Sequence, residues 1–205
     1  MASVFFRAFE ENDYILINKW RNDPELQAMT GGVFRYVSLE IERNWVKEKT
    51  LNNRTEIYLA ICLNDDSKTM IGYLSFNKID YINRSAECGG LIIGDKDYRD
   101  GIIWVECYLF IMSYAFESLN MNRIYGVCLN EHKLTMTMNL SIMFWTFEGL
   151  CKQAVYKGGK YHDLAMLALL REDYLQHKLQ GDFEISAILK RVGKFRKELN
   201  TSSNQ

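Results

Sequence analysis

A short charged segment leads directly into an apolar segment near the middle of this 205-residue chain. Lys96 and Arg99 come first, Asp100 and Gly101 follow, and the apolar residues begin at Ile102. The first turn of a helix binds anions through free backbone N–H groups and the helix dipole, and a nearby arginine can grip a phosphate with two hydrogen bonds. The segment therefore lies where a Gly-rich phosphate-binding turn would be expected.

The same turn has features that oppose a phosphate. Glycines let a phosphate approach the backbone closely, but Gly101 is followed by the bulky residues Ile102, Ile103 and Trp104. Asp100 is a good N-cap residue, and it would place a carboxylate where the phosphate would lie. A nucleotide-like ligand is therefore expected to meet crowding and repulsion at this turn.

The composition is that of one globular domain. Apolar residues make up 48% of the chain and charged residues 25%, which is ordinary for a soluble protein of this length. The net charge of −1 gives no electrostatic signal for nucleic acid or for an anionic membrane. We therefore expect neither a nucleic-acid partner nor a membrane partner.

The cysteines indicate the compartment. Five cysteines stand in separate apolar segments, without the paired spacing of metal ligands. An odd number of scattered thiols favours a reducing compartment, so we expect a cytoplasmic protein with no metal site.

Hydrophobic periodicity and turn residues predict the order of the elements that must position these residues. The predicted elements are a strand at 4–9, a helix from about 13 that ends before 24, a helix after 38, strands at 56–63, 69–79 and 86–93, a buried helix at 104–119, a strand at 122–129, a helix at 131–143, a hairpin of 154–156 and 161–170, and a helix at about 183–199. The three strands before the buried helix form an antiparallel meander, and the strand after it can pair in parallel.

Several local sequences are informative in this order. Trp20-Arg21-Asn22-Asp23-Pro24-Glu25, Ala86-Glu87-Cys88-Gly89, Tyr114-Ala115-Phe116-Glu117 and Tyr156-Lys157-Gly158-Gly159-Lys160-Tyr161-His162-Asp163 occur one after another. They resemble the GCN5-related N-acetyltransferase (GNAT) superfamily, in particular its ribosomal-protein-alanine-acetyltransferase-like branch. The resemblance implies an α/β (α+β) GNAT fold, with a mixed, mostly antiparallel central sheet flanked by helices and an extra C-terminal helix.

The resemblance also implies a domain organisation. It covers roughly residues 3 to 174, so we expect an acetyltransferase-like domain at 1–174. A helical extension at 175–200 and a disordered tail at 201–205 follow. The extra helix is a candidate contact for a homodimer.

In this family, a motif Arg/Gln-x-x-Gly-x-Gly/Ala cradles the pyrophosphate of acetyl-CoA. Aligning Arg99 with the motif puts Ile102 and Trp104 on its two small-residue positions, while backbone at the end of the fourth strand binds the thioester and pantetheine. The implied acetyl-CoA contacts are Ile92, Ile93, Gly94, Arg99, Asp100, Gly101, Ile102, Ile103 and Trp104.

A second family signature is also degraded. The family has an Asn, a Ser and a Tyr on the helix after the fifth strand, and those positions fall here on Lys133, Met136 and Leu140. No tyrosine lies between Tyr125 and Tyr156. A tyrosine general acid from this helix is therefore not expected.

Glu87 is the candidate general base, because the resemblance places it on the fourth strand near the reaction centre; a structural carboxylate in the sheet is the alternative. Cys88 follows Glu87 on the strand, so its side chain points to the opposite face of the sheet, and it is expected to be a packed thiol. In this family, the loops around the first two helices and the closing hairpin determine which amine substrate binds. That implies substrate contacts at Trp20, Tyr36, Tyr156 and His162. For His162, a structural or substrate-loop role is favoured over catalysis.

Three functions remain open. The chain is expected to be an acetyl-CoA-dependent N-acetyltransferase for the primary amine of a small molecule, an amino sugar or a peptide N-terminus. A carrier-bound pantetheine donor is the second possibility, because it would need the strand contacts and not the pyrophosphate cradle. The third is a catalytically silent GNAT-like binding or regulatory module.

Overall fold

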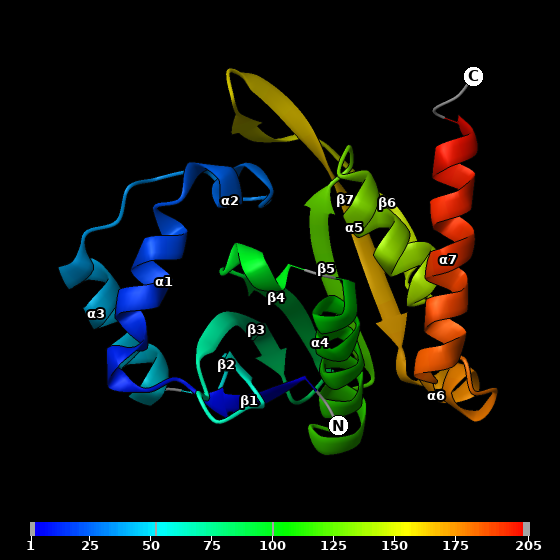
Figure 1. Ribbon diagram of the computed structural model, residues 1–205, viewed down its shortest axis with the longest axis horizontal. Helices are drawn as coiled ribbons and strands as arrows, with labels where there is room; N and C mark the ends of the chain where they lie inside the picture. The colour runs from blue at the N-terminus through cyan, green and yellow to red at the C-terminus, as the bar shows by residue number, and fades with distance from the viewer. Residues whose placement is uncertain (1–2, 52, 100, 203–205) are drawn as a thin grey trace.

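A twisted mixed sheet forms the centre of the molecule in the computed structural model, which describes residues 3–51, 53–99 and 101–202 (Figure 1). Seven strands in this part of the chain lie in the order β1-β2-β3-β4-β5-β7-β6. Their bounds are β1 Val4–Ala8, β2 Ile57–Leu63, β3 Met70–Asp80, β4 Ser85–Ile93, β5 Arg123–Leu129, β6 Thr146–Lys157 and β7 Lys160–Leu170. β4 and β5 run parallel, and the other described neighbours run antiparallel. The predicted mixed, mostly antiparallel sheet is confirmed.

The helices cover both faces of the sheet. Their bounds are α1 Tyr14–Arg21, α2 Pro24–Ala28, α3 Leu39–Leu51, α4 Gly101–Ser113, α5 Lys133–Thr137, α6 Arg171–Leu179 and α7 Ile185–Ser202. A π-helical turn follows both α4 and α5, at Tyr114–Ser118 and Met138–Ile142. None of the described helices is long and apolar enough to cross a bilayer.

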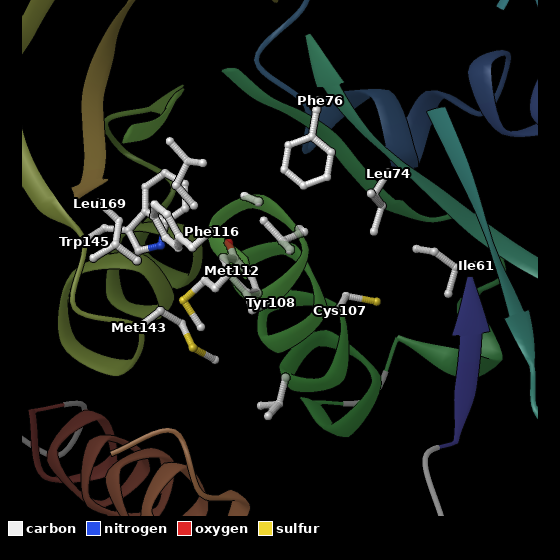
Figure 2. Packing of buried hydrophobic residues seen from close by; sticks show 14 of the residues in the cluster. Ile61, Leu74, Phe76, Cys107, Tyr108, Met112, Phe116, Met143, Trp145 and Leu169 are labelled. Carbon is white, nitrogen blue, oxygen red and sulfur yellow. The ribbon is translucent and has the colours of Figure 1, made fainter. Parts of the chain in front are cut away.

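Two separate apolar clusters hold these layers together. The larger cluster packs α4 against one face of the sheet, with Phe76 from β3 and Met112 and Phe116 fully buried (Figure 2). The smaller cluster packs α1 and α3 on the other face, around Ile17 and Val46. Because α4 is apolar almost all round, it can lie between the sheet and the C-terminal helices.

The predicted end of α1 before Pro24 is confirmed, but a short helix that begins there was missed. Asp23 caps α2, and its carboxylate accepts hydrogen bonds from the backbone N–H groups of Glu25 and Leu26 at 2.9 and 3.4 Å. Pro24 fits the first turn of a helix, where its missing N–H group has no partner to lose. The proline therefore ends one helix and starts the next.

The hairpin is longer than predicted. β6 runs from Thr146 to Lys157, whereas the sequence predicts only 154–156. β6 lies at the edge of the sheet, where most of its side chains are exposed. The alternation of apolar and polar residues that marks a half-buried strand is therefore absent from most of it.

The C-terminal region holds two helices where one was predicted. α6 was missed because Tyr174 is its one buried residue, so it has no apolar stripe. α7 continues to Ser202, two residues into the predicted tail, and 203–205 lie outside the described residues. The boundaries of the domain and its extension stay predictions.

Candidate functional site

The parallel pair β4–β5 is short and then parts. The two strands pair only at Ser85–Arg123, Ala86–Ile124 and Glu87–Tyr125. After Glu87, β4 continues to Ile93 paired with β3 (Figure 1). The backbone between the two strands is therefore free of mutual hydrogen bonds from this point to their carboxyl ends. Gly126, the next residue of β5, is close to β4, because a Cβ there would lie 3.2 Å from the carbonyl oxygen of Cys88.

A bulge in β4 lies beside this point. Tyr73 and Ser75 of β3 pair with Ile92 and Gly89, so two steps along β3 face three steps along β4. Gly90 has a φ of +55°, a conformation that glycine adopts without strain. Because a bulge bends its strand, it supports the departure of β4 from β5.

The start of α4 follows the end of β4. The N–H groups of its first turn have no intrahelical partners. Arg99 Nε and Nη2 donate to the carbonyl oxygens of Ile93 and Gly94 at 3.0 and 2.9 Å. The guanidinium therefore links the end of β4 to the turn before α4. The Nε and Nη2 donors of Arg99 are both used in these two hydrogen bonds. Asp100 lies outside the described residues.

The bulky residues of this turn point in different directions. Trp104 packs against the larger cluster, with its ring centroid 6.2 Å from that of Tyr108, and Ile103 is buried. Ile102 is 55% exposed. Of the bulky side chains at the start of α4, that of Ile102 is therefore the one that faces solvent.

On the α4 side, the space where the strands part is lined by sulfur and by one phenol. Cys128 Sγ lies 3.5 Å from Met136 Sδ. The hydroxyl of Tyr108 hydrogen-bonds the side chain of Asn139, and burial raises the pKa of Tyr108. Cys88 packs against the larger cluster, as predicted, and burial raises the pKa of its thiol. Figure 2 shows Tyr108 on α4 within the larger cluster.

Tyr108 was not found from the sequence. The family signature directs attention to the helix after β5, whereas this hydroxyl comes from α4. A tyrosine in an apolar helix gives no signal of its own, because its ring satisfies the helical pattern and its hydroxyl position depends on packing.

The opposite side of the sheet carries the polar groups. Glu87 faces Asn77 of β3 and Tyr125 of β5 in register. Lys78 Nζ lies 2.7 Å from Glu87 Oε2. The Oδ1 atom of Asn77 is buried and has no hydrogen-bond partner among the described residues. Glu87, Lys78 and Asn77 thus form a polar group at the last paired position of β4 and β5.

Trp20 does not take the predicted place in a substrate loop. Its side chain is 4% exposed, and a Cβ on Gly94 would lie 2.0 Å from the Trp20 ring. Glycine at 94 therefore lets the indole pack directly under the end of β4. The structure corrects the prediction, because Trp20 supports the strand and is not accessible to a substrate.

The hairpin is docked on the N-terminal helices. Lys157 Nζ donates to the carbonyl oxygens of Gln27 and Thr30 at the end of α2. His162 Nε2 lies 3.0 Å from the carbonyl oxygen of Lys157, and its Nδ1 contacts the Glu131 carboxylate. His162 therefore braces the hairpin in this structure.

Tyr36 and Tyr156 remain available to a ligand. Tyr36 lies between α2 and α3, with its ring against Phe34, and Tyr156 packs edge-on against Tyr161 on the hairpin. Both keep more than half of their surface exposed. Among the described residues, no group of three His, Cys, Asp or Glu side chains is arranged to hold a metal ion.

A mixed sheet whose parallel pair parts beside a helix N-terminus defines the N-acetyltransferase class of fold. The profile of the Acetyltransferase (GNAT) domain matches residues 3–138, so the chain belongs to the GNAT acetyltransferase family.

Solved structures share the fold. The chain superposes on a spermidine N-acetyltransferase from Vibrio cholerae in complex with CoA and spermine, with a TM-score of 0.76, 21% identity, and coverage of 85% of this chain and 99% of that one. A dodecameric structure of the Vibrio cholerae spermidine N-acetyltransferase gives a TM-score of 0.71, 23% identity, and coverage of 86% and 99%. At these identities the likeness concerns the fold.

One curated relative is similar in sequence. YdaF of Bacillus subtilis (strain 168), for which a role as a ribosomal N-acetyltransferase has been proposed, is 30% identical over 109 residues. The match covers 52% of this chain and 56% of that protein. The chain therefore spans little more than half the length of this relative.

Proposed function

We propose that this protein transfers the acetyl group of acetyl-CoA to the primary amine of a small molecule, an amino sugar or a peptide N-terminus. The observation that carries the proposal is the parting of β4 from β5 directly after Glu87, while β4 continues toward the turn that opens α4. A carboxylate then lies where the sheet opens, and a helix N-terminus, which favours anions, follows the end of the same strand. Membership of the GNAT family supports the same reaction.

The donor is assigned to the turn at the start of α4 and to the end of β4. Backbone N–H groups at Gly101 and Ile102 would hold the phosphates. Ile92 to Gly94 line the path toward the opened sheet, although Arg99 already occupies the carbonyl oxygens of Ile93 and Gly94. When bound, the donor supplies an activated thioester carbonyl.

Two side chains are assigned to proton transfer. Glu87 accepts a proton from the ammonium of the acceptor, directly or through a water, so that the free amine can attack the thioester carbonyl. Tyr108 carries a phenolic proton on the α4 side, where its hydroxyl lies beside the side chain of Asn139. We assign to it the protonation of the leaving thiolate.

The acceptor is assigned to the side of the sheet that carries Glu87. Tyr36, Tyr156 and His162 come from the segments that the Lys157 contacts hold together at this side. The spermine named with the Vibrio cholerae structure makes polyamines one acceptor class to test here, and the peptide N-terminus of a ribosomal protein is another.

Location and assembly are part of the proposal. All five cysteines are free thiols, which suits the reducing cytoplasm. Ile185 and Leu189 lie four residues apart on α7 and are half-exposed, which supports a homodimer contact on this helix.

The test combines binding and turnover. A ligand at one hundred times its Kd stabilises a protein by about 2.7 kcal/mol, so CoA should raise the Tm in a thermal-shift titration. Acetyl-CoA consumption is then measured against spermidine, an amino sugar and an alanine-terminated peptide. Glu87→Gln should lose about 10²-fold or more in kcat. Glu148→Gln is the control, because Glu148 lies on β6 and pairs with Arg123 of β5, and its kcat should not fall.

Each negative result has a defined meaning. Absence of a Tm shift at millimolar CoA would contradict the use of acetyl-CoA. Stabilisation by a pantetheine fragment without stabilisation by CoA would point to a carrier-bound donor. Stabilisation by neither compound would leave the fold as a binding module.

A further inference from the structure

Lys78 is placed by an irregularity in β3. Asn77 pairs with Glu87 and Asp80 with Ser85, so three steps along β3 face two steps along β4. Lys78 itself has a φ of +49°, in the left-handed region. A regular strand would send Lys78 to the face opposite Asn77, because side chains alternate. The bulge turns it to the face of Asn77 and Glu87, as bulges beside active sites do.

The resulting contact is close. Lys78 Nζ lies 2.7 Å from Glu87 Oε2, with 72% of the lysine side chain and 18% of the glutamate side chain exposed. An exposed ion pair contributes little to stability, and a non-glycine residue with positive φ carries backbone strain. The pair is therefore poorly explained as a stabilising contact.

The ammonium of Lys78 occupies the position that an acceptor needs. In the function proposed above, the acceptor nitrogen must come within hydrogen-bond reach of Glu87 and beside the point where β4 and β5 part. Lys78 Nζ already meets the first condition and, because Glu87 is the last residue of β4 paired with β5, it lies next to that point.

We propose that Lys78 is a site of self-acetylation, at which the enzyme transfers the acetyl group of acetyl-CoA to its own lysine when no other amine is bound. This inference rests on the proposed acetyl-CoA-dependent function. It adds an intramolecular acceptor, and with it a modification site beside the general base.

The step balances with the groups present. The Lys78 ammonium gives a proton to the Glu87 carboxylate, and the free amine forms a bond to the thioester carbonyl carbon. The carbon–sulfur bond breaks, and the thiolate takes up a proton to give CoA. The second ammonium proton leaves to solvent, and the product at Lys78 is a neutral amide.

Two neighbours hold the lysine as an ammonium until then. The Glu87 carboxylate raises the pKa of Lys78, and Tyr125 on β5 adds to this. The reaction therefore depends on the transfer of the proton to Glu87. Acetylation would remove the positive charge from Glu87 and leave its carboxylate open to an external amine.

The experiment incubates the full chain with acetyl-CoA in the absence of any amine and follows the intact mass and the modified peptides by mass spectrometry. We expect one acetyl group at Lys78, formed at a first-order rate that does not depend on protein concentration. Lys78→Arg should remove that modification. Glu87→Gln should slow it at least tenfold, while the background acetylation of exposed lysines such as Lys19 and Lys47 stays unchanged.

The outcomes separate this inference from the function on which it rests. If spermidine or a peptide amine is acetylated while Lys78 stays unmodified, the self-acetylation is wrong and the proposed function stands. Equal labelling of Lys78 in the wild type and in Glu87→Gln also overturns the inference, because the reaction is then purely chemical. If CoA neither binds nor supports transfer to any amine, both proposals fall together.

Discussion

Two glutamates on the same side of the sheet lie in opposite environments. Glu87 is partly exposed and has a cation beside it. Glu42 on α3 is fully buried; its Oε1 lies 3.2 Å from Arg21 Nη1, yet neither carboxylate oxygen has a hydrogen-bond partner among the described residues. The Arg21 guanidinium is also shared with the Trp45 ring, 3.9 Å away. A buried carboxylate with such incomplete pairing is costly.

This cost predicts a pH dependence. Burial raises the pKa of Glu42 above its usual 4.5. A raised pKa in the folded state gives stability that is present below pH 4.5 and is lost as pH rises through the folded pKa. Glu42→Gln should therefore become more stable relative to the wild type as pH rises from 4 toward 8.

Urea unfolding at several pH values in this range measures the difference. Glu40→Gln, on the exposed face of the same helix, is the control and should show a much smaller change. A difference between Glu42→Gln and the wild type that shrinks with rising pH would contradict the assigned direction.

Tyr108 gives the second prediction at this scale. Tyr108→Phe removes the hydroxyl beside Asn139 and keeps the ring in the core. If the phenol protonates the leaving thiolate, kcat should fall by about 10²-fold, while the KM for the donor changes little. Tyr114→Phe is the control, because that ring stacks on Phe110 in the same helical segment. Equal kcat values for the two variants would exclude the role.

At the scale of single elements, the start of α4 decides how the donor can bind. Glycine at either small-residue position of the family motif would open the turn, but Trp104 packs on the larger cluster and Ile102 is exposed. Substitution of Trp104 would therefore remove core packing. Ile102 is the position at which crowding can be relieved without loss of the core.

Ile102→Gly should tighten CoA binding by about tenfold, equivalent to about 1.4 kcal/mol. The substitution costs the helix about 1 kcal/mol of propensity. Ile185→Gly is a matched control, because Ile185 is exposed to the same degree in the first turn of α7. Isothermal titration calorimetry measures the Kd of CoA for both variants. Unchanged or weaker CoA binding in Ile102→Gly would show that the side chain does not crowd the phosphate.

The elements that the sequence missed share a physical reason. β6 is an exposed edge strand and α6 buries one residue. Neither needs an apolar face, so neither has the periodicity that reveals a strand or an amphipathic helix. The meander, the buried helix and the strand after it were predicted because each buries an apolar face.

At the scale of the whole molecule, the C-terminal helices belong to the packed core. Tyr174 stacks on Phe116 with ring centroids 4.9 Å apart. Arg191 Nη2 donates to the carbonyl oxygen of Ile142 at 3.1 Å. Ile188 of α7 is fully buried in the larger cluster. The extension predicted as a separate region is therefore expected to unfold with the rest of the chain.

Ile188→Ala should lower the free energy of unfolding by about 2–5 kcal/mol, because it removes fully buried methyl groups. At a protein concentration at which the chain is monomeric, Leu189→Ala, at the next position and half-exposed, should change it by about 0.5 kcal/mol or less. Calorimetry of both variants should show one cooperative transition. A separate low-temperature transition in Ile188→Ala would mean that α7 folds independently of the domain.

The sequence by itself determined the order of the strands and of α1, α3, α4, α5 and α7, the apolar faces that build the sheet, the family, and the opposite phases of Glu87 and Cys88. These follow from local patterns, because burial repeats every two residues in a strand and about every 3.6 in a helix. The tertiary structure alone decided the contacts of Arg99, Trp20, Tyr108 and Lys78. Arg99 turns back on β4, Trp20 packs under Gly94, and Tyr108 reaches Asn139 from another helix. Lys78 contacts Glu87 because one extra residue in β3 turns the lysine side chain to the face of the sheet that carries Glu87. A one-residue change of register between strands moves a side chain to the other face, and here the change comes from a bulge in the pairing of β3 with β4.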